Sequence, residues 1–344
     1  MEARPVAPDD FARFARRVLF IGAVIVFSFL AWELRSVLIL AFAGVLLALI
    51  LRALAGPFVH WTPLGTSAAV SVVALMVLVV ISGAGMVIGN QLSTQLTALW
   101  THLPELANKA EHSFEESAIG KALVQVLGPP PEFFSGVTVK SALSAATATF
   151  GILADVLIIV VLGLFFAYMP QLYMNGVIAL VPAVHKSRMR EVLSSTARAL
   201  RAWLLGQFVS MIIVGAISWA GLSLLNVPLA LGLAFLAFVL EFIPVIGPIV
   251  AAVPAVLVGL SQSPMAGLWV ALLYLGIHVI EGYVVVPMLQ RWAVHIPPAL
   301  TVIGVVAFGF IFGWLGVLLA TPLMVATVVW VKMIYVESVL KEVG

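Results

Sequence analysis

The chain has 344 residues, of which 63% are hydrophobic and only 9% are charged. Soluble domains are roughly 45–50% apolar and about 25% charged, so this composition excludes a soluble globular enzyme and indicates an exterior that faces lipid. The net charge of +2 reflects 17 basic residues scattered along the chain, which excludes nucleic acid as a partner. The sequence has no cysteine, which excludes disulfides, thiolate metal sites and cysteine nucleophiles.

Residues 1–89 contain three apolar segments that we expect to be membrane helices. Val18–Trp32 and Ser36–Leu51 are each short for a spanning helix, which needs about 20 apolar residues, so we expect a tight helical pair with flanking arginines. Ser67–Ile88 is long enough to span alone. No small-residue cleavage pattern follows the first segment, so we expect that helix to be retained and not removed as a signal peptide.

Residues 90–149 form the one sizeable water-facing segment that the sequence predicts, and acidic residues outnumber lysines in it. Its first half has an apolar stripe at helical spacing, formed by Leu96, Leu99, Trp100, Leu103 and Leu106. We expect an amphipathic helix that lies on the membrane or on the helical bundle. A subunit contact or a substrate vestibule is the alternative.

Residues 150–201 contain a fourth membrane helix, Phe150–Met169, and a basic connection after it. The connection and the N-terminal stretch are both rich in arginine, and the positive-inside rule places both in the cytoplasm. An even number of crossings must separate them, which agrees with four helices between. The segment 90–149 is then external.

Residues 202–344 begin with a continuous helix, Ala202–Leu225, and continue with a broken apolar segment. A first arm runs from Pro228 to Glu241, and a second arm ends at Leu260. Each arm is too short to span the bilayer, which favours a re-entrant hairpin whose tip lies in a protein-lined or wet cavity. Two pairs of short tilted spans are the alternative. The break contains three residues that favour a turn: Pro244, Gly247 and Pro248.

A similar arrangement returns nearer the C-terminus. A continuous helix, Pro264–Val286, precedes a second broken segment that starts at Pro298. This segment is interrupted at Gly309, Gly313 and Gly316. The sequence therefore predicts an all-α polytopic membrane protein of about 6–8 membrane helices, with two helical hairpins in an inverted repeat in the C-terminal half. Inverted repeats with broken helices indicate secondary transporters. The alternative is that these prolines and glycines serve helix packing alone.

Few ionisable residues lie in the apolar segments, and each is a functional candidate because burying a charge in a membrane is costly. Glu241, beside the first hairpin tip, is expected either to bind a cation or proton or to hydrogen-bond the tip amides. His278 and Glu281 lie one helical turn apart and face the same way. They are expected either to relay protons or to form an interfacial pair in which Glu281 balances the charge of Arg291. Asp155 is placed near the outer end of the fourth helix, where water also stabilises it.

The sequence contains no Walker loop, no H-E-x-x-H metal helix and no G-x-S-x-G elbow, so we expect neither an enzyme nor an ATPase, and no cofactor or metal. Transport energy would then come from an ion or solute gradient. A passive channel and a scaffold for partner proteins are the competing functions. Neutral polar residues that could line a path are Gln207, Asn226, Gln262, Thr301 and Thr321.

The C-terminal motifs also carry a family resemblance. They are EFIPVIGP at Glu241–Pro248, IPPAL at Ile296–Leu300, GWLGV at Gly313–Val317 and ATPL at Ala320–Leu323. Together they resemble the autoinducer-2 exporter family, also described as PerM-like permeases. The resemblance implies a multi-pass permease of the bacterial inner membrane, homo-oligomeric, with members linked to autoinducer-2 export and others to sodium/proton exchange.

We therefore expect a permease that contacts the lipid bilayer and a small polar solute or cation, with both termini in the cytoplasm. Transport and ion coupling are expected at the ionisable and hairpin residues already described: Glu241, Pro244, Gly247, Pro248, His278, Glu281, Gly313, Gly316 and Asp155.

Overall fold

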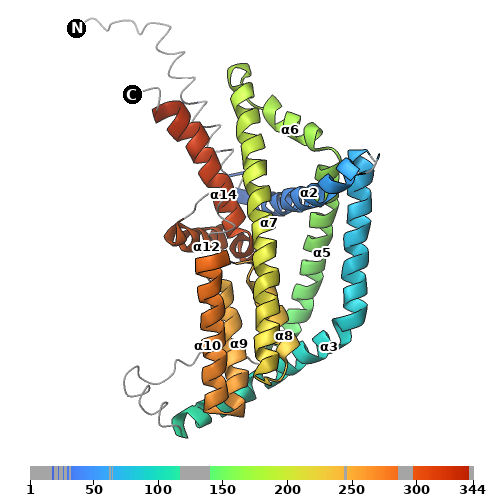
Figure 1. Ribbon diagram of the computed structural model, residues 1–344. Coiled ribbons are helices and arrows are strands. Elements are labelled where there is room, and N and C mark those ends of the chain that lie inside the picture. The colour runs from blue at the N-terminus through green and yellow to red at the C-terminus, as the bar shows by residue number, and fades with distance from the viewer. Residues whose placement is uncertain are drawn as a thin grey trace, which may run out of the picture.

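The computed structural model describes five stretches of the chain and a few isolated positions, and in these stretches the backbone forms helices joined by short turns. No strand occurs among the described residues, which confirms the predicted all-α class (Figure 1). The first predicted helix, Val18–Trp32, lies almost entirely outside the described residues. The described stretches are 32–61, 65–116, 140–243, 246–285 and 297–340.

Helix α2 (Arg35–Trp61) packs closely against α5 (Lys140–Tyr168). A Cβ atom on Gly44 would press on the Leu162 side chain, and one on Gly163 would overlap the Leu47 side chain. Small residues let two membrane helices approach closely, where van der Waals contact replaces the missing hydrophobic driving force. These glycines therefore fix α2 against α5.

Helix α3 (Thr66–Glu116) contains the predicted span Ser67–Ile88 and continues past it without a break. In Figure 1 it descends along one side of the molecule, bends, and crosses the lower end of the bundle. Its second half contacts two short apolar helices, α8 (Ala230–Leu240) and α9 (Ile246–Gln262).

Two side chains anchor this crossing half of α3. Leu99 is only 2% exposed and belongs to the core formed with α8 and α9. Gln95 Oε1 accepts a hydrogen bond from the Gly232 N–H at 2.9 Å. The predicted helix therefore lies on the bundle. Residues 117–139 of the predicted external segment, and the side chains of Trp100, Leu103 and Leu106, are outside the described residues.

The predicted fourth span, Phe150–Met169, coincides with the second part of α5 and ends one residue beyond it, and the chain then bends by 89° into α6 (Pro170–Ala179). A 3₁₀ turn at Ala183–His185 leads into α7 (Lys186–Leu224), which has 39 residues and is about 58 Å long at 1.5 Å per residue. The hydrocarbon core is only about 30 Å thick. The basic residues expected in a connection therefore belong to α7, which is longer than that core is thick.

The first predicted hairpin corresponds to α8 and α9, which contact each other and are joined at residues 241–245. Ser263 then caps α10 (Pro264–Ile280) by accepting a hydrogen bond from the Ala266 N–H at 3.1 Å. A short π-helical segment, Glu281–Val285, extends α10.

The second predicted hairpin corresponds to α12 (Pro298–Phe312), the short α13 (Trp314–Leu318) and α14 (Ala320–Trp330), which continues as a π-helix to Leu340. Gly313 separates α12 from α13 with a φ angle of 68°, a left-handed conformation that glycine adopts without strain. The sequence therefore located both breaks. The inverted orientation of the two repeats stays a prediction.

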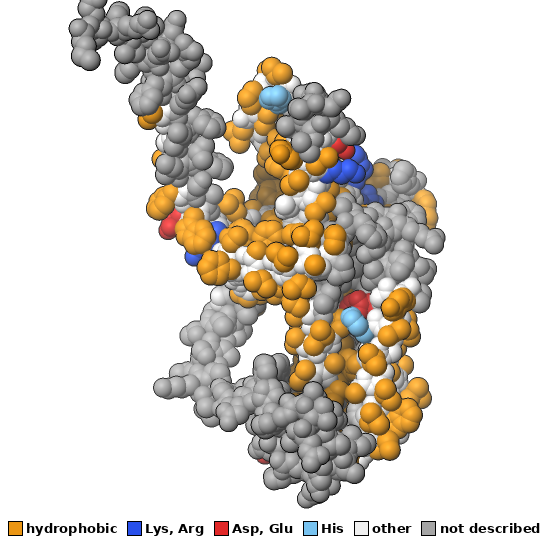
Figure 2. Space-filling view, turned by 90° about the vertical axis from the view of Figure 1, so that its left-hand side faces the viewer, with side chains coloured by type: hydrophobic (Ala, Val, Ile, Leu, Met, Phe, Trp, Pro, Cys, Tyr) orange, Lys and Arg blue, Asp and Glu red, His pale blue; other side chains and the backbone are white. Residues whose placement is uncertain are grey.

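Several described helices suit a membrane. Hydrophobic side chains cover most of the described surface in Figure 2. Among the described residues, five helices are long and apolar enough to cross a bilayer, or six if the bent α5–α6 pair counts as one span, and three more are apolar but shorter. The five long segments are Arg35–Val59, Thr66–Gly83, Ala183–Leu224, Pro264–Tyr283 and Ala320–Glu337.

The start of α7 and the C-terminal helix lie side by side. Arg188 donates to the Met333 carbonyl oxygen at 2.7 Å and pairs with Glu337 at 3.0 Å. The same guanidinium pairs with Glu191 at 2.7 Å. The basic first turns of α7 and the last described helix therefore meet at the same end of the molecule.

Candidate functional site

Both hairpin tips pack against the middle of α7. Leu200 and Leu204 of α7 are each 2% exposed and form one hydrophobic cluster with residues of the two tips. From the first tip comes Phe242, whose ring meets Trp203 edge-on at 5.8 Å between centroids. From the second tip come Phe312, Leu315 and Leu319. The two broken segments, far apart in the sequence, therefore meet at one place.

Each tip is closed by a glycine against a backbone carbonyl group. A Cβ atom on Gly247 would overlap the Leu240 carbonyl oxygen, and one on Gly316 would overlap the Phe308 carbonyl oxygen. In both hairpins the glycine belongs to the element after the break and the carbonyl to the arm before it. The two hairpins thus use the same closure. Pro244, also predicted for the first tip, is outside the described residues.

Glu241 ends the first arm, and its side chain is buried at this meeting point, with 1% of the residue exposed. Ser210 Oγ of α7 donates to Glu241 Oε1 at 3.2 Å, and Gln207 Nε2 donates to the Glu241 carbonyl oxygen at 2.6 Å. The other carboxylate oxygen, Oε2, has no hydrogen-bond partner. A buried charged oxygen without a partner is costly, so Glu241 is held in place at the expense of stability.

Glu281, at the end of α10, lies against the same carboxyl group. It is 7% exposed, acts electrostatically on Glu241 and is within hydrogen-bonding reach of it. His278 Nδ1 lies 3.3 Å from Glu281 Oε2, as the spacing of one helical turn predicted. The His278 side chain is 48% exposed, so the three residues run from the surface to the buried tip.

The groups around Glu241 are hydrogen-bond donors, which suit an anionic or proton-sharing oxygen. Two ionised carboxylates offer each other only acceptors, so Oε2 gains a donor from Glu281 only when one of the two carries a proton. Among the described residues, no three histidine, aspartate or glutamate side chains gather closely enough to hold a metal ion. The arrangement therefore fits proton chemistry better than a metal centre.

A cavity of about 480 Å³ between α9 and α10 reaches this cluster from the side. Pro248 of the first tip, Tyr274 and His278 line it, and aliphatic side chains complete its wall. One half-exposed imidazole therefore connects this cavity to the Glu281 carboxylate.

Comparisons of the sequence with known proteins assign the chain to one family. The sequence profile described as AI-2E family transporter matches residues 19–335. The chain belongs to the AI-2E transporter family. It is 31% identical over 333 residues to the protein named "Putative transport protein MT0215" of Mycobacterium tuberculosis, covering 90% of this chain and 87% of that protein.

Two further relatives show how far the similarity extends. The protein named "Putative transport protein YueF" of Bacillus subtilis strain 168 is 23% identical over 257 residues, which is 68% of each chain. The Escherichia coli K12 "AI-2 transport protein TqsA" is 31% identical over 118 residues, or 33% of each chain. These relatives establish this chain as a multi-pass membrane protein of a transporter family.

The fold of this AI-2E family member brings together some of the predicted site residues and separates others. Glu241, Glu281, His278 and the closing glycines gather around the two tips. Asp155 is half-buried in α5, which packs mainly on α2 and not on the helices of the cluster. Arg291, the predicted partner of Glu281, is outside the described residues.

Sequence reasoning overlooked the contribution of hydroxyl groups. Ser210, which donates to Glu241, looks like an ordinary serine in an apolar helix. Further along the same α7–α10 contact, the buried hydroxyl groups of Ser218 and Tyr274 face each other. The signal that could have found them is the spacing of Gln207, Ser210 and Ser218, which places three polar residues along one side of α7.

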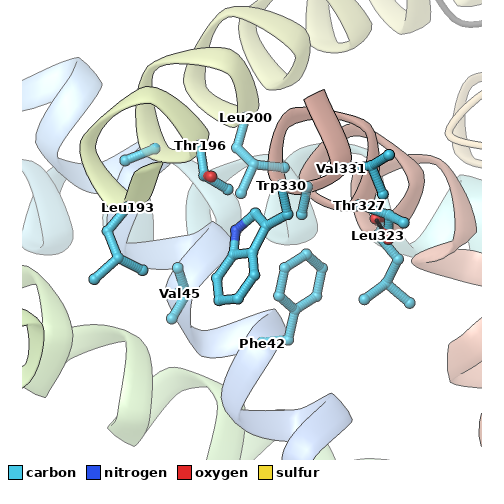
Figure 3. A pocket seen from close by; sticks show the side chains of 11 residues that line it. Phe42, Val45, Leu193, Thr196, Leu200, Leu323, Thr327, Trp330 and Val331 are labelled. Atoms are coloured by element: carbon cyan, nitrogen blue, oxygen red, sulfur yellow. Dashed lines mark hydrogen bonds between the residues drawn. The ribbon is translucent and has the colours of Figure 1, made fainter. Parts of the chain in front are cut away.

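A second cavity of about 480 Å³ lies between α2, α7 and α14, with the Phe42 ring and the Trp330 indole at its centre (Figure 3). Its two hydroxyl groups bond to their own helices: Thr196 donates to the Val192 carbonyl oxygen and Thr327 to the Leu323 carbonyl oxygen, each at 2.8 Å. The wall is therefore effectively apolar, which distinguishes this cavity from the acidic cluster.

Proposed function

We propose that this AI-2E family protein is a secondary transporter that exports a small polar solute such as autoinducer-2, driven by an ion gradient. The observation that carries the proposal is Glu241, a buried carboxyl group at the point where two broken hairpins meet. Half-helix ends at such a point are where secondary transporters bind substrates and coupling ions. The relative TqsA is named "AI-2 transport protein", which supports this class of solute.

The packing suggests how ion binding would drive movement. An ionised Glu241 in an apolar cluster resists displacement of the tip, because its remaining hydrogen bonds come from Ser210 and Gln207 of α7. When a proton sits on Glu241 itself, the bond from Ser210 weakens, since hydrogen bonds to charged groups are the stronger ones. The hairpin would then be free to shift along α7 and to expose the solute path on one side at a time.

We place the protein in the bacterial inner membrane with both termini in the cytoplasm. The supporting observation is that the basic first turns of α7 lie beside the C-terminal helix, through Arg188 and Glu337. The arginines in the first turns of α7 agree with the positive-inside rule. Assembly as a homo-oligomer, implied by the family resemblance, stays a prediction.

The test is solute flux in proteoliposomes under imposed proton and sodium gradients, with autoinducer-2 and other small polar solutes screened in parallel. We expect gradient-driven flux in the wild type and its loss in Glu241→Gln, which keeps the side-chain shape. Glu191→Gln is the matched control, because Glu191 is exposed and lies in the first turns of α7.

Two other results would refute the coupled exporter. Flux that survives Glu241→Gln and ignores both gradients indicates a passive channel, with Glu241 as a structural acid. Counterflow of sodium and protons without any solute indicates a sodium/proton antiporter.

A further inference from the structure

The carboxyl groups of Glu241 and Glu281 form a pair whose hydrogen bonding is incomplete when both are ionised. Ser210 occupies Oε1 of Glu241, while Oε2 is buried without a donor and the Glu281 carboxyl group is the neighbour within reach. One proton on Glu281 supplies the missing donor, because a protonated carboxyl group carries an O–H. One proton therefore completes the arrangement.

We infer that Glu241 and Glu281 hold one proton between them, and that His278 is the group through which this proton exchanges with water. This inference rests on the proposed function, because it assigns the coupling ion at the same site. It goes further by naming the proton as that ion, Glu281 as the second half of the site and His278 as its connection to the exterior.

A proton can pass from the cavity beside His278 to the Glu241–Glu281 pair in two transfers. A hydronium ion that enters the cavity lined by His278 gives a proton to Nε2 and leaves as water, and the ring gives its Nδ1 proton to Glu281 Oε2, 3.3 Å away. The imidazole ends neutral and Glu281 ends as a carboxylic acid, whose O–H donates to Glu241 Oε2. Histidine suits this step because its charge changes between about pH 5 and 8.

Among the described residues, the titratable side chains near the pair are those of His278 and Tyr274, both on α10. Helix α7 offers Gln207 and Ser210 there, and α8 and α9 contain no titratable residue besides Glu241. Helix α10 contributes His278. Helix α3 contacts the far end of α8, where Gln95 binds Gly232, about 13 Å along the helix from Glu241. The charge of the pair is therefore set by its own protons.

A proton fits this shell better than a metal cation. Metal cations such as Ca²⁺ take six or more oxygen ligands, while the polar groups that α7 directs at Glu241 are a hydroxyl and an amide N–H that both donate. Sodium binding is the outcome that the experiment has to exclude.

The test is infrared difference spectroscopy of the full-length protein in liposomes, with no gradient and no solute. We expect the wild type at neutral pH to show the carbonyl stretch of one protonated, buried carboxylic acid. Glu241→Gln should lose this band, because Glu281 then faces only His278 and ionises. Glu281→Gln should lose or shift it, while Glu191→Gln should keep it unchanged. The two pair variants fail independently, so misfolding of one leaves the other informative.

Three results would overturn the inference: no band in the wild type, the wild-type band retained in both pair variants, or a band that sodium removes at constant pH. For the exchange route, His278→Gln should slow deuterium exchange of the band at least tenfold without removing it, and an unchanged exchange rate contradicts the role of His278. Since the spectra need no transport, a band with no flux in proteoliposomes would disprove the proposed function alone.

Discussion

Replacing Gly247 by alanine tests whether the first hairpin must be closed for transport. The new Cβ atom would overlap the Leu240 carbonyl oxygen, and both atoms belong to the backbone, so no side chain can rotate away. Overpacking a well-packed interior lowers the free energy of unfolding by about 1–3 kcal/mol when neighbouring side chains can adjust. Because backbone atoms cannot adjust in that way, we expect a loss of about 3 kcal/mol here. Gly316→Ala meets the Phe308 carbonyl oxygen in the same way and should cost a similar amount.

The matched control is Gly276→Ala in α10, because nothing lies within 4 Å of a Cβ atom built there. Alanine is the better helix former by about 1 kcal/mol, so this variant should be as stable as the wild type or more so. The assay is thermal unfolding of the purified variants in detergent, followed by flux in proteoliposomes. We expect a lower Tm and lost flux for both tip variants and wild-type behaviour for the control. A wild-type Tm for Gly247→Ala would refute the close approach of the two arms.

Two further predictions concern hydrogen bonds of α7. Ser210→Ala removes the donor to Glu241 Oε1, and losing a hydrogen bond to a charged group costs about 1.5–3 kcal/mol of stability. The Tm of this variant should therefore fall. The control, Ser223→Ala, changes an exposed serine of the same helix and should leave the Tm unchanged. A Tm that falls equally in both variants would contradict the bond. Arg188→Gln removes the link to Met333 and Glu337, so backbone amides of residues 331–340 should exchange hydrogen faster while those of α10 do not. Identical exchange in wild type and variant would show that Arg188 does not anchor the C-terminal helix.

The helices and the hairpin breaks could be predicted because their signals are local. Apolar runs of about 20 residues identify long membrane helices, and clustered proline and glycine residues identify the tips. The length of α3 could not be predicted this way. Polar residues from Asn90 onward end the apolar segment without ending the helix, and the Ser93 and Thr94 hydroxyl groups donate within the helix to the Asn90 carbonyl oxygen.

The composition of the site depends on contacts that no local pattern encodes. The sequence identified Glu241 as the acid of the first tip and Glu281 as the partner of His278, as two separate features. They meet because α9 leads away from the tip and α10 returns to it, which places the end of α10 beside the end of α8. Ser210 escaped notice because one serine in an apolar helix is as consistent with helix packing as with a site.

The two hairpins share a geometry but not a chemistry. Both are closed by a glycine against a carbonyl oxygen, and both tips enter the cluster around Leu200 and Leu204. Only the first places a titratable side chain there, because the described residues from α12 through α14 contain no acidic, basic or histidine residue. A change of protonation therefore acts on one hairpin while the other keeps its packing. Under the proposed function, such an asymmetry would let a single proton move one tip relative to the other, which is what alternating exposure of a shared path requires.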